Sequence, residues 1–146
     1  TTMRFMMIVK ASKDSEAGVL PSKELIAEMG KFNEEMVKAG VLLAAEGLQA
    51  SSKGVRVQFS GGKRAVIDGP FTETKELIAG FWLIQVKSRE EAVQWALRSP
   101  CPGGENRDGQ IEIRQVFDAS DFPEDVFPPE EAGREQALRE EIRKRE

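Results

Sequence analysis

The chain has 146 residues, of which 40% are hydrophobic and 32% charged, and its formal net charge is −4. This length is enough for one domain whose core needs neither a disulfide nor a metal ion. The composition includes one cysteine but neither histidine nor tyrosine, which excludes Ser-His and Cys-His nucleophile pairs, His-Asp dyads, imidazole metal ligands and phenolic acids.

The charge is distributed unevenly along the chain. Residues 1–117 contain 16 basic and 15 acidic side chains, whereas residues 118–146 contain 5 and 10. A nearly neutral body with an acidic tail offers no basic surface for nucleic acid or for an anionic membrane. The apolar runs, such as Val41–Ala45, are too short to cross a bilayer, and the N-terminal run resembles a strand and not a secretory signal. We therefore expect a cytoplasmic protein in which Cys101, without a histidine to activate it, is an inert loop residue.

The N-terminal third predicts a strand followed by an amphipathic helix. Met3–Lys10 is apolar on both alternating faces, which is typical of a central strand. Ser22 is the predicted N-cap of the helix and Gly40 its stop. Between them, apolar residues recur at helical spacing and predict a core-facing stripe: Leu25, Met29, Phe32 and Met36.

The middle of the chain predicts a second strand, a hairpin and a helical turn. Val41–Ala45 is a short apolar strand. Residues 55–59 alternate apolar and polar, Gly61-Gly62 forms a two-residue turn, and residues 63–67 return as the second arm of the hairpin. A helical turn is predicted over Glu73–Ile78, after Asp68-Gly69-Pro70.

The next segment completes the body. Gly80–Lys87 is an apolar strand, and Ser88 with Glu91 forms a capping box that opens a helix through Leu97. A last strand contains Ile111 and Ile113. The order β-α-β-(hairpin)-β-α-β predicts an α+β, ferredoxin-like domain over residues 1–117, with two helices on one face of an antiparallel sheet.

The C-terminal residues differ in composition from the body. Residues 118–129 are acidic and contain proline, which predicts a linker, and 11 of the residues 130–146 are charged. Four pairs of Glu with Arg or Lys at i,i+4 favour a solvated helix over residues 130–146. Leu138 and Ile142 form a short apolar stripe, through which this helix could instead dock on the body or on a partner.

The segment Asp68–Glu76 (DGPFTETKE) is the most distinctive local sequence, and it has two interpretations. In the first it is a turn: Gly69 and Pro70 bend the chain, and Asp68 accepts hydrogen bonds from the turn's amides. In the second it is the edge of a pocket that carries Asp68, Thr72, Lys75 and Glu76.

This segment carries a resemblance to a known family. The chain resembles the YCII-related superfamily, in the branch named for the DGPF-x-ETKE signature, with Thr72 at the variable position. Three further segments agree with that branch, although Ala45 replaces a glycine and Gln115 a proline: residues 39–49, 80–84 and 112–116. The resemblance covers roughly residues 3–117, and many members carry a charged C-terminal extension.

The resemblance implies a ferredoxin-like chain that pairs into a dimeric α+β barrel, with a cleft between the sheet and the helices of each subunit. Some YCII-related proteins are lyase- or dehalogenase-like enzymes that use a His-Asp pair in this cleft, a mechanism that a chain without histidine cannot share. Members of the DGPF branch often accompany extracytoplasmic-function sigma factors.

Carboxylates and a lysine are the remaining groups for acid–base chemistry. The catalytic candidates are Asp68, Glu46, Glu76 and Lys75, because a carboxylate or a desolvated lysine in an apolar cleft can act as a general acid or base. The predicted ligand-binding residues are Asp68, Phe71, Thr72, Lys75 and Trp82. Neither a metal site nor a cofactor is expected, since carboxylates do not cluster at ligand spacing and a haem would lack an axial histidine or tyrosine.

Two functional hypotheses of different classes follow. The first is a homodimeric barrel that binds a small organic molecule beside the DGPF turn, with catalysis left open. The second is a non-catalytic regulatory protein that contacts an extracytoplasmic-function sigma factor through the charged C-terminal helix.

Overall fold

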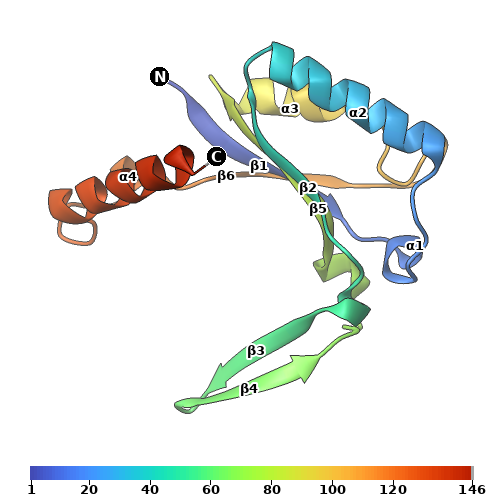
Figure 1. The fold of residues 1–146 in the computed structure, drawn as a ribbon, viewed down its shortest axis with the longest axis horizontal. Coiled ribbons are helices and arrows are strands. Elements are labelled where there is room, and N and C mark those ends of the chain that lie inside the picture. Colours follow the sequence, from blue (N-terminus) through green and yellow to red (C-terminus); the bar gives the residue numbers. More distant parts are fainter. Residues whose placement is uncertain (146) are drawn as a thin grey trace. The chain divides into compact units, whose positions relative to one another are not determined.

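The body of the protein is built on a four-stranded antiparallel sheet, seen in a computed structural model that describes residues 1–145 (Figure 1). The sheet has the strand order β2-β5-β1-β6. Its strands are β1 (Met3–Lys10), β2 (Leu42–Gly47), β5 (Ile78–Val86) and β6 (Ile111–Gln115). With a helix after β1 and another after β5, this is the ferredoxin-like arrangement, and the α+β prediction is confirmed.

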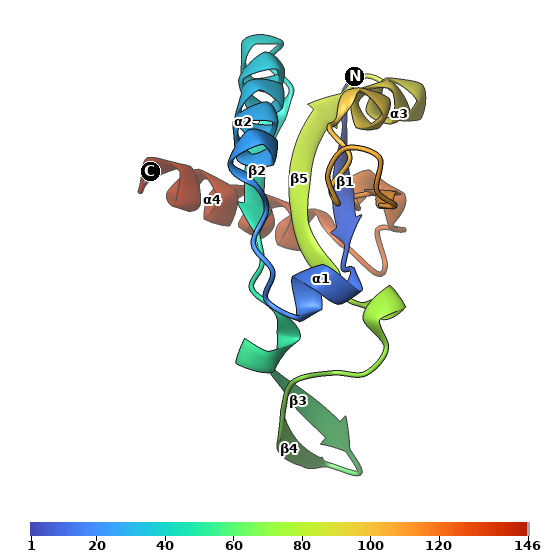
Figure 2. The same cartoon turned by 90° about the vertical axis from the view of Figure 1, so that its right-hand side faces the viewer.

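Two helices cover one face of this sheet (Figure 2). In α2 (Lys23–Lys38), the Ser22 side chain accepts a hydrogen bond from the Leu25 amide at 3.1 Å, as expected for an N-cap. The helix ends at Lys38, just before Gly40, which has a φ of +75°, and the amide of Val41 donates to the carbonyl of Met36. In α3 (Arg89–Arg98), Ser88 is the N-cap, but Glu91 binds the Lys87 amide and not that of Ser88, so the predicted capping box is only half formed.

The core lies between these helices and the sheet. Alternate residues of the central strands point into it, among them Phe5, Met7, Ile84 and Val86. Phe32 of α2 packs edge-on against Trp82 of β5, with ring centroids 5.5 Å apart. The predicted stripe therefore faces the core, because Leu25, Phe32 and Met36 are buried and Met29 is partly buried.

The opposite face of the sheet is covered neither by α2 nor by α3. Cross-strand pairing places Met6 beside Leu83 and Ile8 beside Phe81, and the side chains of these pairs alternate with those of the core. We call these four residues the open face. All four are partly exposed, so the open face is an apolar surface at the centre of the sheet.

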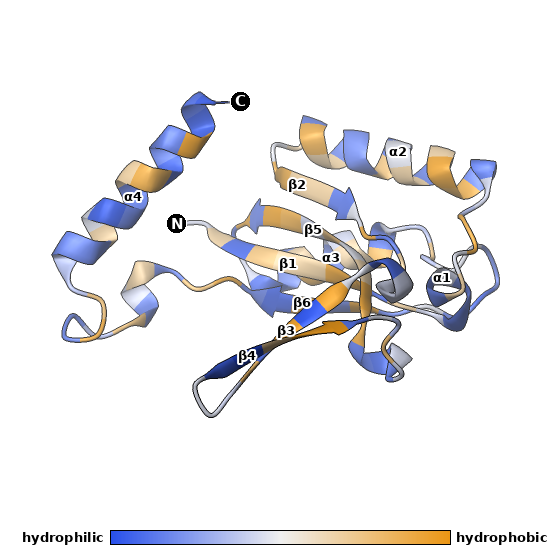
Figure 3. Cartoon of the chain, turned by 60° about the horizontal axis from the view of Figure 1, so that its bottom comes forward, coloured by the Kyte–Doolittle hydropathy of each residue, from blue (hydrophilic) through white to orange (hydrophobic). Residues whose placement is uncertain are grey.

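A hairpin projects from the body between β2 and β5 (Figures 1 and 2). Strands β3 (Val55–Ser60) and β4 (Lys63–Asp68) pair with each other only, and Gly61-Gly62 forms the turn as predicted. Apolar stretches of the hairpin are orange in Figure 3. One of its faces carries Val57 paired with Val66, and Phe59, which is 66% exposed. The hairpin thus carries apolar side chains that the body does not bury.

Two local expectations differ from the structure. The helical turn predicted over Glu73–Ile78 is a shorter 3₁₀ turn, η2 (Thr74–Glu76), because Ile78 pairs with Lys10 as the first residue of β5. A four-residue helix, α1 (Lys13–Glu16), lies in the connection after β1, where a loop was expected. Ser12 and Ser15 cap it reciprocally, at 3.1 and 2.9 Å.

The chain divides into two compact units, residues 1–115 and residues 116–146. The second contains η3 (Ala119–Asp121), three phenylalanines in sequential ring contact, and α4 (Pro129–Lys144). The predicted C-terminal helix is thus present, while Glu146 lies outside the described residues. No helix within residues 1–145 has the length and apolar character needed to cross a membrane.

Candidate functional site

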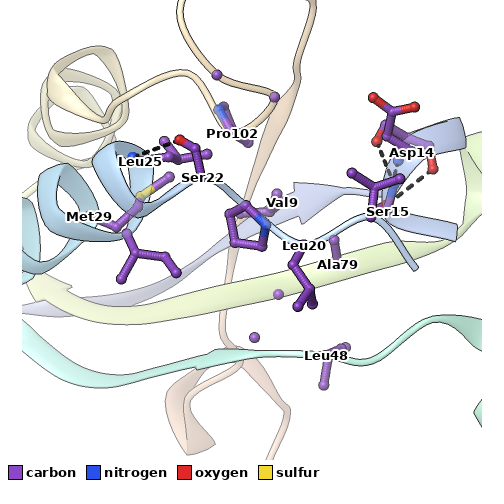
Figure 4. A pocket seen from close by; sticks show the side chains of 18 of the residues that line it. Val9, Asp14, Ser15, Leu20, Ser22, Leu25, Met29, Leu48, Ala79 and Pro102 are labelled. Carbon is purple, nitrogen blue, oxygen red and sulfur yellow. Dashed lines mark hydrogen bonds between the residues drawn. The ribbon is translucent and has the colours of Figure 1, made fainter. Parts of the chain in front are cut away.

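A cavity of about 1860 Å³ opens beside the N-terminal half of α2 (Figure 4). Its walls come from α2 and from four further places: the connection between β1 and α2, the neighbouring ends of β2 and β5, the 3₁₀ turn η1 (Ser51–Lys53) with its flank, and the loop 102–108. Segments far apart in the sequence therefore meet around one space on the side of the sheet that the helices cover.

Much of the wall is apolar. Side chains from α2, β1 and β5 line it together with residues of three connecting segments: Val9, Leu20, Leu25, Met29, Leu48, Ala79 and Pro102 (Figure 4). Leu20 is 84% exposed, so this side chain lies at the mouth and not in the packed core. Apolar walls of this kind are typical of sites for small organic molecules.

Trp82 and Asn33 line the cavity where α2 faces β5. Trp82 is 5% exposed, and its indole N–H donates to the Asn33 side-chain oxygen at 2.7 Å. The Phe32 ring packs against it at an interplanar angle of 90°. Trp82 is therefore a rigid part of the wall, held by packing and by one hydrogen bond.

The charged residues of the cavity come mainly from its connecting segments. The basic ones are Lys13, Lys53 and Arg107, and the acidic ones are Asp14, Glu46, Glu105 and Asp108. Arg107 pairs with Asp14 at 2.9 Å, which joins the loop 102–108 to α1. The loop is braced internally, since the Cys101 thiol donates to the Arg107 carbonyl at 3.1 Å.

The DGPF turn lies against η1, the segment that forms another wall of the cavity. The Gly69 amide donates to the Gly54 carbonyl at 2.9 Å, and the Phe71 amide donates to the Ser51 hydroxyl at 3.0 Å. A side chain at position 69 would place its Cβ 1.7 Å from the Ser51 carbonyl oxygen. Only glycine permits this approach.

Glu16 of α1 completes the anchor of this turn. Its carboxylate accepts hydrogen bonds from the Ser51 hydroxyl and, at 3.0 Å, from the Ser51 amide. The Arg56 guanidinium lies over the Phe71 ring, 3.8 Å from the centroid. The turn, the base of the hairpin and α1 are therefore joined through Ser51.

A comparison with family models gives a match to the YCII-related domain over residues 3–120. The chain belongs to the YCII-related family. An uncharacterised protein of Rhizobium meliloti (strain 1021) is 32% identical to this YCII-related chain over 74 residues, which is 51% of the chain. The aligned part spans 60% of the length of that relative.

The predicted site residues of this YCII-related domain separate into two groups. Glu46 and Trp82 line the cavity. Glu46 pairs with Phe81 across β2 and β5, so its side chain lies on the open-face side of the sheet, whereas Trp82 points to the covered face with the core residues. The others lie in or next to the DGPF turn and are not among the residues lining the cavity: Asp68, Phe71, Thr72, Lys75 and Glu76.

Of this second group, Phe71 is partly buried under Arg56, and the other four are exposed. Asp68 ends β4 opposite Val55, and among the described residues its carboxylate accepts no hydrogen bond from the turn. The turn is instead held by Ser51 and Gly54, which lie outside the signature.

Three residues important to the site were not identified from the sequence: Asn33, Ser51 and Glu16. Asn33 follows Phe32 in the predicted core stripe, so a polar residue at the edge of that stripe was the available signal. Nothing local singles out Ser51 or Glu16. Within residues 1–145, no cluster of three or more Cys, Asp or Glu residues could hold a metal ion in this YCII-related domain.

Proposed function

We propose that the protein is a homodimeric, cytoplasmic member of the DGPF branch of the YCII-related family that binds a small organic molecule. The cavity beside α2 is the observation that carries this proposal, because it combines an apolar wall and a rigid tryptophan with polar side chains from its connecting segments. Its location between the sheet and a helix matches the cleft that the family resemblance implies.

The proposal gives the two groups of residues different roles. Trp82 forms the inner apolar contact for the ligand, whereas Glu46 lies at the rim, with its side chain on the face of the sheet that carries Phe81. Residues of the DGPF turn hold the η1 wall in place through Ser51. Any reaction in this site proceeds without histidine.

The open face supports the dimer. A sheet with apolar side chains on both faces is stable when both faces are covered, and α2 and α3 cover only one of them. We propose that the open face of a second copy covers the other, as in a dimeric α+β barrel.

Thermal-shift screening of a small-molecule library tests ligand binding, with a variant that narrows the cavity beside α2. Gly30 lies on the cavity side of α2, and a Cβ at this position would meet no atom within 4 Å. We expect Gly30→Leu to fold and to lose the stabilisation that library compounds give the wild type. Gly133→Leu, the same change at an unhindered position of α4, is the matched control and should keep it.

A parallel screen of Asp68→Ala, Lys75→Ala and Glu76→Ala tests the turn. If the compounds stabilise these variants as much as the wild type, the three residues serve only the structure of the turn. If the stabilisation is lost, the ligand binds beside the turn. If no compound stabilises the wild type, the proposed binding function is contradicted.

The C-terminal helix favours a second candidate function. None of the residues of α4 is buried, and Leu138 and Ile142, 56% and 63% exposed, lie one turn apart. We propose that this stripe binds a partner protein, an extracytoplasmic-function sigma factor being the class that the DGPF resemblance implies. Binding of a purified sigma factor from the same genome by the full chain, and not by a chain lacking residues 121–146, would support this function.

A further inference from the structure

The hydrogen bond between Trp82 and Asn33 determines how the Asn33 amide is oriented. An indole N–H is a donor only, so its partner at 2.7 Å must be the amide oxygen of Asn33. The amide nitrogen, with its two N–H donors, therefore points away from Trp82.

This nitrogen belongs to a residue of the cavity wall and has no protein acceptor. Asn33 is partly buried and lines the cavity, and its nitrogen makes no hydrogen bond among the described residues. None of the buried side-chain nitrogens or oxygens lacks a partner in that part of the chain, so the Asn33 nitrogen is not fully buried. It is a fixed donor without a protein acceptor, next to an immobile indole ring.

The surroundings of this donor favour a neutral acceptor. The lining residues nearest to Asn33 along α2 are apolar, namely Ile26, Met29 and Gly30. The charged lining residues come from other segments, and the acidic ones outnumber the basic ones by four to three. This balance gives no net attraction for a carboxylate or phosphate.

We propose that Asn33 selects the ligand by donating a hydrogen bond to a neutral carbonyl oxygen while an apolar group packs against Trp82. The ligand class is a small uncharged ketone, ester or amide with an aromatic or aliphatic body. This inference rests on the proposed function, since it assigns a ligand class to the same cavity. A site built around a polar donor discriminates against an analogue that lacks the acceptor, because the donor is then desolvated without a partner.

The test compares three probes of similar size: acetophenone, ethylbenzene and benzoate. Titrations of the ¹⁵N-labelled full chain are followed by the indole N–H signals of Trp82, which lines the cavity, and of Trp95, which does not and serves as the internal control. We expect acetophenone to bind the wild type about three- to tenfold more tightly than ethylbenzene, the range that one neutral hydrogen bond provides. Benzoate should bind more weakly than acetophenone.

Two variants separate the donor from the cavity. Asn33→Asp keeps an oxygen for the Trp82 indole but removes the N–H donors, and Asn33→Leu removes the donors without adding charge. In Asn33→Asp, the preference for acetophenone over ethylbenzene should fall to less than about twofold, while ethylbenzene still shifts the Trp82 signal. In Asn33→Leu the preference should also fall, but less, because the Trp82 indole N–H loses its acceptor and becomes a free donor. A chain that fails to fold would lose its dispersed amide spectrum, and the other variant then decides the test.

The outcomes distinguish this inference from the function on which it rests. Probes that shift the Trp82 signal with the same preference in wild type and variants, or tighter binding of benzoate, would overturn the role of Asn33 and leave the cavity as the binding site. If none of the three probes moves the Trp82 signal or the amides around the cavity, the proposed function is contradicted as well.

Discussion

Ser51 joins three segments that the sequence separates widely. Its hydroxyl accepts the Phe71 amide and donates to Glu16, and its carbonyl lies against Gly69. These contacts explain the glycine of the signature by sterics and the position of Phe71 by hydrogen bonding. At the residue scale, the DGPF segment is a turn that packs closely against η1, and η1 is in turn hydrogen-bonded to Glu16 of α1.

Gly69→Ala should destabilise the protein by about 1–3 kcal/mol, because the new Cβ would overlap the Ser51 backbone and force it to move. Gly54→Ala is the matched control, since its nearest neighbour is at an ordinary 3.5 Å. Urea unfolding measures the free energy of unfolding of both variants. Equal stability of the two variants would show that the turn accommodates a side chain at position 69.

Ser51→Ala removes the acceptor of the partly buried Phe71 amide and one of the donors to Glu16. We expect a loss of about 1–3 kcal/mol and faster hydrogen exchange at the Phe71 amide. The neighbouring exposed residue gives the control Ser52→Ala, which should change neither. Unaltered exchange at Phe71 in Ser51→Ala would contradict the role of the hydroxyl.

At the scale of the elements, local signals were sufficient to predict the strands and the two long helices. The signals for α2 are all local: the N-cap Ser22, the apolar stripe from Leu25 to Met36, and Gly40 just after the helix. Such a pattern can be recognised without knowledge of the tertiary structure. The turn predicted over Glu73–Ile78 was too long because β-pairing of Ile78 with Lys10, a distant residue, overrides the local preference.

The cavity could not be predicted in the same way. Asn33 and Trp82 are 49 positions apart, and Glu16 and Ser51 are 35 apart. Only the folded chain brings these pairs together. The residues of the DGPF turn, on which the predicted site depended, pack against η1 and do not line the cavity. Trp82 and Glu46 were the two predicted residues that the structure places at the cavity.

The hairpin β3–β4 is an element that the body does not need for its own core. Its two ends meet at the hydrogen bond between Gly54 and Gly69, and its strands pair only with each other. Replacing residues 55–68 by a single glycine should therefore leave a folded body with the Trp82 indole signal at its wild-type position. Loss of the cooperative thermal transition would show instead that the hairpin stabilises the body.

At the scale of the whole molecule, the open face determines the expected assembly. Ile8 lies on the central strand of this face, and a charge there would be desolvated in a sheet-to-sheet interface. We expect light scattering to show a wild-type dimer, with twice the 16.2 kDa mass of one chain, and an Ile8→Lys monomer, with about the mass of one chain. Val37→Lys, on the exposed side of α2, should remain dimeric, and a monomeric wild type would contradict the dimer.

The location of a bound ligand is tested most directly by a crystal structure of the full chain with a compound that stabilises it in the thermal-shift screen. We expect density for the compound between the N-terminal half of α2 and the loop 102–108, in contact with Trp82 and with an acceptor atom at hydrogen-bond distance from the Asn33 nitrogen. Density on the open face or beside the DGPF turn, with the cavity beside α2 unoccupied, would contradict the proposed site.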